Sequence, residues 1–134
     1  MKKILILLLI STVFLFSGFK FNRGLILFNK EPINRDNVLL NTKKFNAGER
    51  VYYLFIAPKK MKNKYIRVQI FKMTDKAPWG GNAVVRTKDY RLMKDEKYYH
   101  TNYFVLYEKG RYVMQVFSMD DLQHPLSLND FYIK

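Results

Sequence analysis

The chain has 134 residues, with 24 Lys and Arg against 11 Asp and Glu, and 49% of its residues are hydrophobic. This is the length of one domain, and so high an apolar and aromatic content excludes a disordered chain. The absence of cysteine excludes disulfide frameworks, thiolate zinc sites, iron–sulfur clusters and cysteine nucleophiles. The formal net charge of +13 is large for a domain of this size and favours an anionic partner.

Residues 1–18 have the pattern of a secretory signal. A basic start precedes a continuous apolar run, and Ser17 and Gly18 supply small residues for cleavage. We therefore expect an exported protein, located in the periplasm or at the cell surface of a bacterium. The alternative is an uncleaved inner-membrane anchor formed by residues 4–19, although this run is slightly shorter than a spanning helix requires.

Behind the signal, the positive charge is unevenly distributed. Residues 19–72 hold 13 basic and 3 acidic side chains, whereas residues 73–134 hold 9 basic and 8 acidic ones. The densest stretch, residues 58–64, contains four lysines and no acid, and its Pro and Asn predict a connecting loop. A surface of one sign attracts polyanions, so this loop is a candidate contact; the alternative is that its cations only improve solubility. The candidate contact consists of Lys59, Lys60, Lys62, Lys64 and the nearby Arg67.

From residue 46 onward the sequence predicts β-strands. Five runs are rich in Val, Ile, Tyr and Phe and are bounded by turn-forming residues: 51–57, 64–73, 82–88, 97–108 and 110–119. A strand upstream of Asn46 and a closing strand at the C-terminus bring the total to about seven, which predicts an all-β antiparallel sandwich. We expect residues 46–134 to form this sandwich and residues 19–45 to be an N-terminal extension or the first strands.

Residues 108–111 predict a tight turn, because Gly110 stands where a three-residue hairpin loop needs a positive φ angle. Residues 98–107 and 111–118 should then pair as an antiparallel hairpin. This segment, with Tyr112 at the start of a late strand, resembles the last hairpin of bacterial immunoglobulin-like or fibronectin-type sandwiches. The resemblance covers residues 97–134 and lacks the cysteine pair and strand tryptophan of true immunoglobulin domains, so it implies architecture alone.

The sequence contains no recognisable catalytic motif. It lacks HExxH, GxSxG and Gly-rich phosphate-loop patterns, and its two histidines, His100 and His124, have no partner signature. We therefore expect no enzymatic activity and no cofactor. Asp120, Asp121 and Asp130 could offer oxygen ligands to calcium but lack the spacing of a calcium-binding loop, so no metal site is predicted.

Aromatic residues suggest a second candidate surface. Tyr65 and Phe71 share a strand face with Arg67, and together they would form an amphipathic platform for docking a protein or stacking on a sugar. Because exposed apolar patches are uncommon on monomers, we expect either that residues 19–45 fold back over this platform or that its strands are buried centrally. Trp79, between Pro78 and two glycines, is either a plug over the end of the sandwich, which we prefer, or an exposed recognition residue.

Together these features predict a non-catalytic binding module of the bacterial envelope. Its expected partner is another envelope protein or an anionic membrane or polymer surface. The alternative is a carbohydrate-binding accessory domain for cell-wall or surface glycans that uses Trp79 and surface tyrosines. Nucleic acid is not an expected partner, because export removes the chain from that compartment. Membrane association through the N-terminal segment remains open, as does the oligomeric state.

Overall fold

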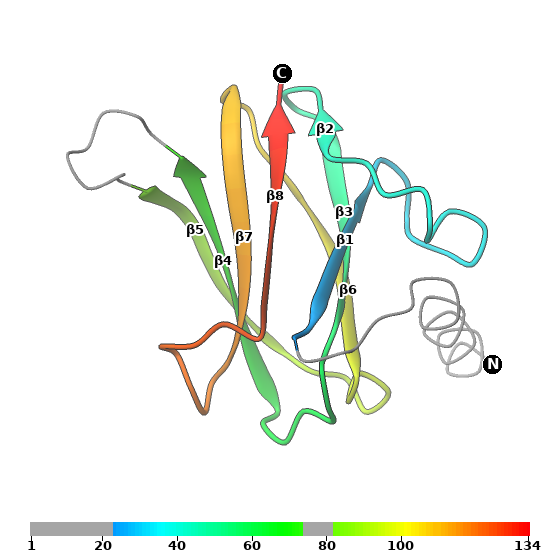
Figure 1. The fold of residues 1–134 in the computed structure, drawn as a ribbon, viewed down its shortest axis with the longest axis vertical. Helices are drawn as coiled ribbons and strands as arrows, with labels where there is room; N and C mark the ends of the chain where they lie inside the picture. Colours follow the sequence, from blue (N-terminus) through cyan, green and yellow to red (C-terminus); the bar gives the residue numbers. More distant parts are fainter. Residues whose placement is uncertain (1–22, 74–81) are drawn as a thin grey trace.

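The computed structural model describes residues 23–73 and 82–134, which form β-strands joined by loops (Figure 1). In this part of the chain the strands are β1 (Leu25–Asn29), β2 (Lys44–Phe45), β3 (Arg50–Ile56), β4 (Tyr65–Met73), β5 (Asn82–Arg91), β6 (Tyr99–Val105), β7 (Gly110–Ser118) and β8 (Ser127–Ile133). Among the described residues, no helix is long and apolar enough to cross a membrane. The all-β class predicted from the sequence is confirmed. The signal or anchor segment and Trp79 lie outside the described residues.

Two sheets pack face to face as the layers of a sandwich (Figure 1). One has the strand order β1-β3-β6, and the other has the order β2-β8-β7-β4-β5. Neighbouring strands are antiparallel, except that the short β2 runs parallel to β8. Because β3, β4, β6 and β7 alternate between the layers, the chain crosses the sandwich repeatedly. This is the Greek-key connectivity of immunoglobulin-like domains, and it confirms the architecture expected from the sequence.

The hairpin predicted around residues 108–111 is wrong. β6 pairs with β3 in one sheet, whereas β7 pairs with β4 and β8 in the other, so the two strands never meet as neighbours. Gly110 does have a positive φ, of 153°, but its turn leads the chain from one layer to the other. The turn residues indicate where the chain bends. A strand after the bend shows the same alternating burial whether it pairs with the preceding strand or joins the opposite sheet. Local patterning therefore cannot separate a hairpin from a crossover.

A tyrosine fixes this crossover to the next strand. The Tyr112 hydroxyl donates a hydrogen bond to the backbone carbonyl of Glu108 at 2.6 Å, four residues upstream. Tyr112 is buried near the start of β7 and stands two residues before the buried Met114. The same geometry defines the tyrosine corner of immunoglobulin-like sandwiches. Tyr112 thus occupies the position that the sequence resemblance assigned to the aromatic residue of a late strand.

The core between the sheets is largely aromatic and is centred on Phe131 of β8. Its ring centroid lies 5.0 Å from Phe28, 5.4 Å from Phe104, 5.5 Å from Tyr112 and 6.4 Å from Phe45. All five residues are buried, and they come from strands of both layers. Such aromatic pairs add about 0.5–1.5 kcal/mol each beyond the burial of their area, so these contacts join the two sheets.

A second apolar cluster lies outside the three-stranded sheet. Val38, from the loop between β1 and β2, packs with Leu54, Ile56 and Tyr99 of that sheet. The loop therefore covers the outward-facing apolar residues of β3 and β6. Covering by residues 19–45 was expected over the platform of the five-stranded sheet. Among the described residues, the β1–β2 loop covers the three-stranded sheet instead, and β2 joins the edge of the five-stranded one.

Candidate anion-binding site

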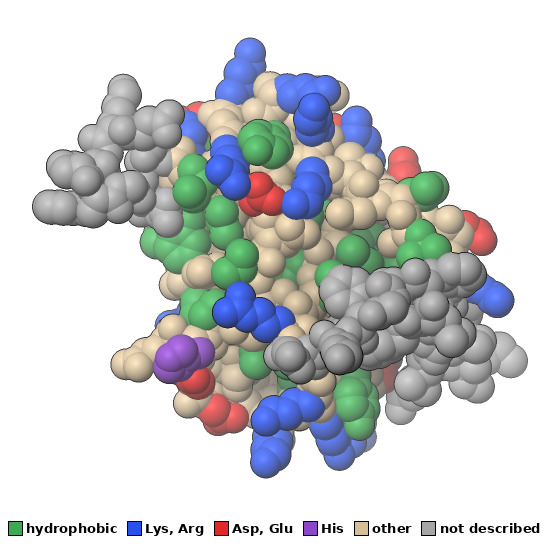
Figure 2. All heavy atoms as spheres, viewed as in Figure 1, with side chains coloured by type: hydrophobic (Ala, Val, Ile, Leu, Met, Phe, Trp, Pro, Cys, Tyr) green, Lys and Arg blue, Asp and Glu red, His purple; other side chains and the backbone are tan. Residues whose placement is uncertain are grey.

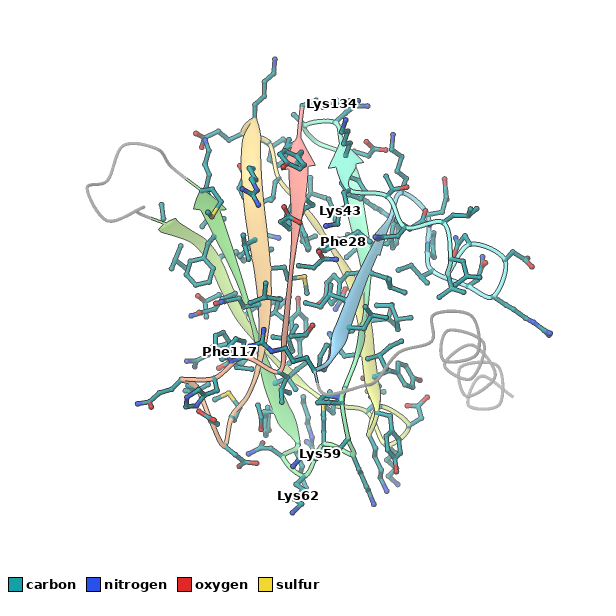
Figure 3. The ribbon with its side chains drawn as sticks, in the orientation of Figure 1. Phe28, Lys43, Lys59, Lys62, Phe117 and Lys134 are labelled. Atoms are coloured by element: carbon teal, nitrogen blue, oxygen red, sulfur yellow. The ribbon has the colours of Figure 1, made fainter. Side chains whose placement is uncertain are left out.

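A cavity of about 640 Å³ opens at one end of the sandwich, between the β3–β4 loop and the β5–β6 loop. The first loop contributes Lys60, Met61, Lys62, Asn63 and Lys64, and the second segment contributes Arg91, Leu92, Met93, Lys94, Glu96 and Lys97. Figure 3 shows Lys59 and Lys62 at this lower end of the molecule. Figure 2 shows Lys and Arg side chains at this lower end beside hydrophobic ones, and further Lys and Arg side chains at the upper end.

Backbone hydrogen bonds hold the two loops against each other. The amide of Met61 donates to the carbonyl of Lys97 at 2.7 Å, and the amide of Leu92 donates to the carbonyl of Lys64 at 2.7 Å. Met61 and Leu92 also pack against the main core. The cavity therefore has an apolar floor continuous with the sandwich, and its walls are fixed by backbone contacts instead of by side chains alone.

The lining is strongly cationic. It contains five lysines and one arginine, and none of these six forms an ion pair within residues 23–73 and 82–134. Because these cations share one cavity, their potentials add, and the cavity has a positive local potential. The two loops together therefore offer a preformed site for a negatively charged group.

Among the described residues, Glu96 is the only acid that lines the cavity, and its carboxylate is hydrogen-bonded below the surface. Its Oε1 accepts a hydrogen bond from the Met93 amide at 3.0 Å, and its Oε2 lies 3.0 Å from Nδ1 of His100. Burial tends to raise the pKa of Glu96, but the hydrogen bonds from His100 and Met93 outweigh it, so the pKa lies below its usual value. Glu96 thus shapes the β5–β6 loop through these two hydrogen bonds.

Behind Glu96, His100 and Tyr53 complete a buried polar chain. Nε2 of His100 lies 3.2 Å from the Tyr53 hydroxyl, and both side chains are buried between the layers. Burial raises the pKa of the Tyr53 phenol, which keeps it neutral. Neither residue lines the cavity. The three side chains form hydrogen bonds with one another, and these bonds connect β3 and β6 to the β5–β6 loop.

The structure separates the site residues predicted from the sequence. Lys60, Lys62 and Lys64 line the cavity, whereas Lys59 lines an adjoining hollow of about 260 Å³ that also contains Asp120 and Asp121. This hollow shares Lys60 and Lys62 with the main cavity. The two acids make the Lys59 side of this end less positive than the β5–β6 side.

The other predicted contact residues lie elsewhere. Arg67 is on the outer face of the five-stranded sheet, where it forms a two-point contact with Asp89 at 2.8 and 3.1 Å. Tyr65 and Phe71 share that face, with Tyr65 exposed and Phe71 half-buried. Arg67 is therefore paired with Asp89 and does not line the cavity. Trp79 lies outside the described residues.

Three cations of the cavity, Arg91, Lys94 and Lys97, were not identified from the sequence. Lys94 and Lys97 flank Asp95 and Glu96, so the stretch reads as charge-balanced. In the fold, Glu96 turns toward His100 and Asp95 accepts a hydrogen bond from the Tyr99 hydroxyl at 3.3 Å. The signal that could have revealed these cations is a pair of lysines on either side of two acids that have local hydrogen-bond partners in a loop.

The acids considered as calcium ligands do not form one group. Asp130 lies on β8 and pairs with Lys43 and Arg111, whereas Asp121 bonds to His124 in the β7–β8 loop. Asp120 accepts a hydrogen bond from the Asn63 side chain at 2.8 Å. Within residues 23–73 and 82–134, no three His, Asp or Glu side chains are placed to hold a metal ion.

No protein-family model matches the chain, and no curated protein matches it by sequence. An immunoglobulin-like protein from Pseudomonas aeruginosa aligns with a TM-score of 0.50 and 14% identity, over 82% of this chain and 92% of that one. A superoxide reductase (neelaredoxin) from Ignicoccus hospitalis aligns with a TM-score of 0.47 and 8% identity, over 84% and 81%. A β-glucosidase from Kluyveromyces marxianus aligns with a TM-score of 0.43 and 11% identity, over 83% of this chain but 14% of that one. The likeness to the Pseudomonas aeruginosa protein extends to the fold alone: the chain is an immunoglobulin-like β-sandwich.

Proposed function

We propose that this protein is an exported, non-catalytic binding module of the bacterial envelope, and that it holds an anionic partner at the cationic cavity. The observation that supports this most directly is the convergence of six cations from two loops on one cavity, with no ion-pair partner among the described residues. An anionic group bound there would relieve their repulsion.

The treatment of charge elsewhere in the fold strengthens this interpretation. Several cations on the strands are paired: Arg67 with Asp89, Lys72 with Glu108, and Arg111 with Asp130, which also pairs with Lys43. The six cavity cations differ from these in that none has an ion pair among the described residues and all line one cavity. A surface that served only solubility would not require them to line a single cavity with an apolar floor.

The test measures binding to immobilised polyphosphate as a function of salt. The variant Lys62→Gln/Lys94→Gln/Lys97→Gln removes three cations of the cavity, and Lys44→Gln/Lys109→Gln/Lys134→Gln removes three exposed lysines elsewhere. Both variants have the same net charge. We expect the cavity variant to lower the slope of log affinity against log salt concentration by about two to three, and the control to lower it much less.

Two results would contradict the proposal. Equal losses in both variants would mean that binding follows net charge and not the cavity. Salt-insensitive binding to glycans that both variants retain would instead favour the carbohydrate-binding alternative.

A further inference from the structure

We infer that the anionic partner is a lipid bilayer, and that the cavity end of the sandwich docks on it with the tip of the β5–β6 loop entering the headgroup region. This inference rests on the proposed function, since it names the partner of the same site. Three observations support it: the apolar side chains among the cations, the point at which the chain enters the sandwich, and the outward spread of the charges.

The first observation is an exposed apolar tip between lysines. Met93 is 67% exposed and Tyr98 is 46% exposed, and both belong to the loop that also presents Lys94 and Lys97. An unbranched apolar side chain suits the acyl boundary, tyrosine suits the headgroup level, and lysine reaches the phosphates while its stem stays apolar. An acidic protein surface would match the lysines but would leave Met93 without an apolar partner.

The second observation is where the chain enters the sandwich. Leu25, the first residue of β1, lies opposite Ile56 at the end of β3, and Ile56 and Ala57 lead directly into the lysine-rich β3–β4 loop. The amide of Gly24 donates to the carbonyl of Leu126 at 2.8 Å. Figure 1 shows the start of β1 and the β3–β4 loop at the same lower end.

This placement matters because of what precedes it in the sequence. The apolar run of residues 4–19 is followed by only four residues, 20–23, before Gly24, and two of these are basic. Four residues span at most about 14 Å. If the apolar run stays in a membrane, the cationic end therefore lies within reach of the headgroups. If the apolar run is cleaved off, the cationic cavity end alone must bind the membrane surface.

The third observation is the spread of the cations over the whole end of the molecule. They come from the β3–β4 loop, from the end of β5 and from the β5–β6 loop, and the lysines among them are exposed. Lys59 and Lys62 both lie at the lower extremity in Figure 3. A fluid anionic surface can place a headgroup beneath each of these cations, which a single small anion in the cavity cannot do.

The test uses the full chain and two kinds of vesicle, phosphatidylglycerol mixed with phosphatidylcholine and phosphatidylcholine alone. Co-sedimentation is measured for the native chain, for Lys62→Gln/Lys94→Gln/Lys97→Gln and for Lys44→Gln/Lys109→Gln/Lys134→Gln. Each lysine near an anionic bilayer contributes about 1 kcal/mol, so the cavity variant should lose about a hundredfold in affinity for anionic vesicles. The control variant should lose less than about tenfold, since long-range attraction is screened by salt.

A second measurement reports on the loop tip. The chain contains no cysteine, so a single Met93→Cys substitution takes one environment-sensitive fluorophore at a defined place. A matched probe at Tyr107→Cys marks a side chain that is 78% exposed and lies outside the cavity lining. On anionic vesicles the emission of the probe at position 93 should shift to the blue, and that of the probe at 107 should not.

The outcomes separate this inference from the proposed function. Loss of polyphosphate binding in the cavity variant, without binding of the native chain to anionic vesicles, would overturn the bilayer and leave the proposed function in place. Vesicle binding that neither triple variant weakens would assign it to the N-terminal segment and overturn the inference. A lysine-dependent association in which the probe at position 93 does not respond would also overturn it, because the tip would not enter the headgroup region.

Discussion

Replacing Tyr112 with Phe removes one hydroxyl group from the tyrosine corner and keeps the ring. The ring is 1% exposed and stacks on Phe131 at a centroid distance of 5.5 Å, so the apolar contacts of the core persist in the variant. The lost interaction is the 2.6 Å hydrogen bond to the Glu108 carbonyl. An intramolecular hydrogen bond contributes about 0.5–1.5 kcal/mol, and leaving the partly buried carbonyl unpaired adds to that loss. We therefore expect a destabilisation of about 1.5 kcal/mol.

Equilibrium urea unfolding measures this loss as a lower midpoint with an unchanged m-value. In thermal unfolding, a loss of this size corresponds to a decrease of about 6 °C in Tm for a domain of this length. Tyr107→Phe is the matched control, because its side chain is 78% exposed and its ring also survives the change. If both variants unfold at the same urea concentration as the native chain, the hydroxyl does not stabilise the crossover and our account of the turn is refuted.

Three further predictions concern the loops and the entry of the chain. Glu96→Gln should cost about 2 kcal/mol at neutral pH, since a charged hydrogen bond to His100 is lost. The pKa of Glu96 is lowered in the folded state. The ionised carboxylate therefore stabilises the fold at pH values above its usual pKa of 4.5, and this stabilisation is lost as the pH falls below it. Urea unfolding of both proteins should then show this difference shrinking as the pH falls below that value, and a constant difference would contradict the assignment. Val38→Ala should cost about 2 kcal/mol in the same assay, because it opens the cluster over the three-stranded sheet; a loss under 0.5 kcal/mol would mean that the loop does not cover it. Gly24→Ala should destabilise by about 1–3 kcal/mol, because its Cβ would lie 2.8 Å from the Ile56 carbonyl oxygen, and a calorimetric Tm equal to that of the native chain would argue against this close approach.

Runs rich in Val, Ile, Tyr and Phe between turn-forming residues predicted the strands of the main sandwich well. β3, β4 and β7 begin and end within one residue of the predicted runs, because each buries every second side chain against one core. The sequence did not predict β1 as a strand with defined bounds. Its sequence, LILFN, is short and continuously apolar, since one side faces the core and the other faces the cover that includes Val38. Continuous apolar runs do not reveal a strand by their period.

The same physics explains why the outer faces were misassigned. Leu54 and Ile56 point away from the main core yet are 3% and 1% exposed, because the β1–β2 loop buries them. On the outer face of the five-stranded sheet, Arg67 pairs with Asp89, and Tyr65 beside it stays exposed. A sequence shows which strands have two apolar faces but not which loop will reach them, because that depends on the strand order.

The position of the positive field is also a product of strand order. In the sequence the excess charge lies in residues 19–72, whose 13 basic side chains face 3 acidic ones. Folding brings acids of the second half to cations of the first: Asp89 to Arg67, Glu108 to Lys72 and Asp130 to Lys43.

These contacts remove charge from the half that looked most basic. In the second half, Asp95 and Glu96 bond to Tyr99 and His100, and Lys94 and Lys97, which flank these acids in the sequence, line the cavity and form no ion pair with them in the described part of the chain. Half of the cations that line the cavity therefore come from a segment whose net charge in the sequence is close to zero. The net charge of a sequence predicts attraction to a polyanion. The place of contact depends on which cations remain without an acidic partner once the strands have paired.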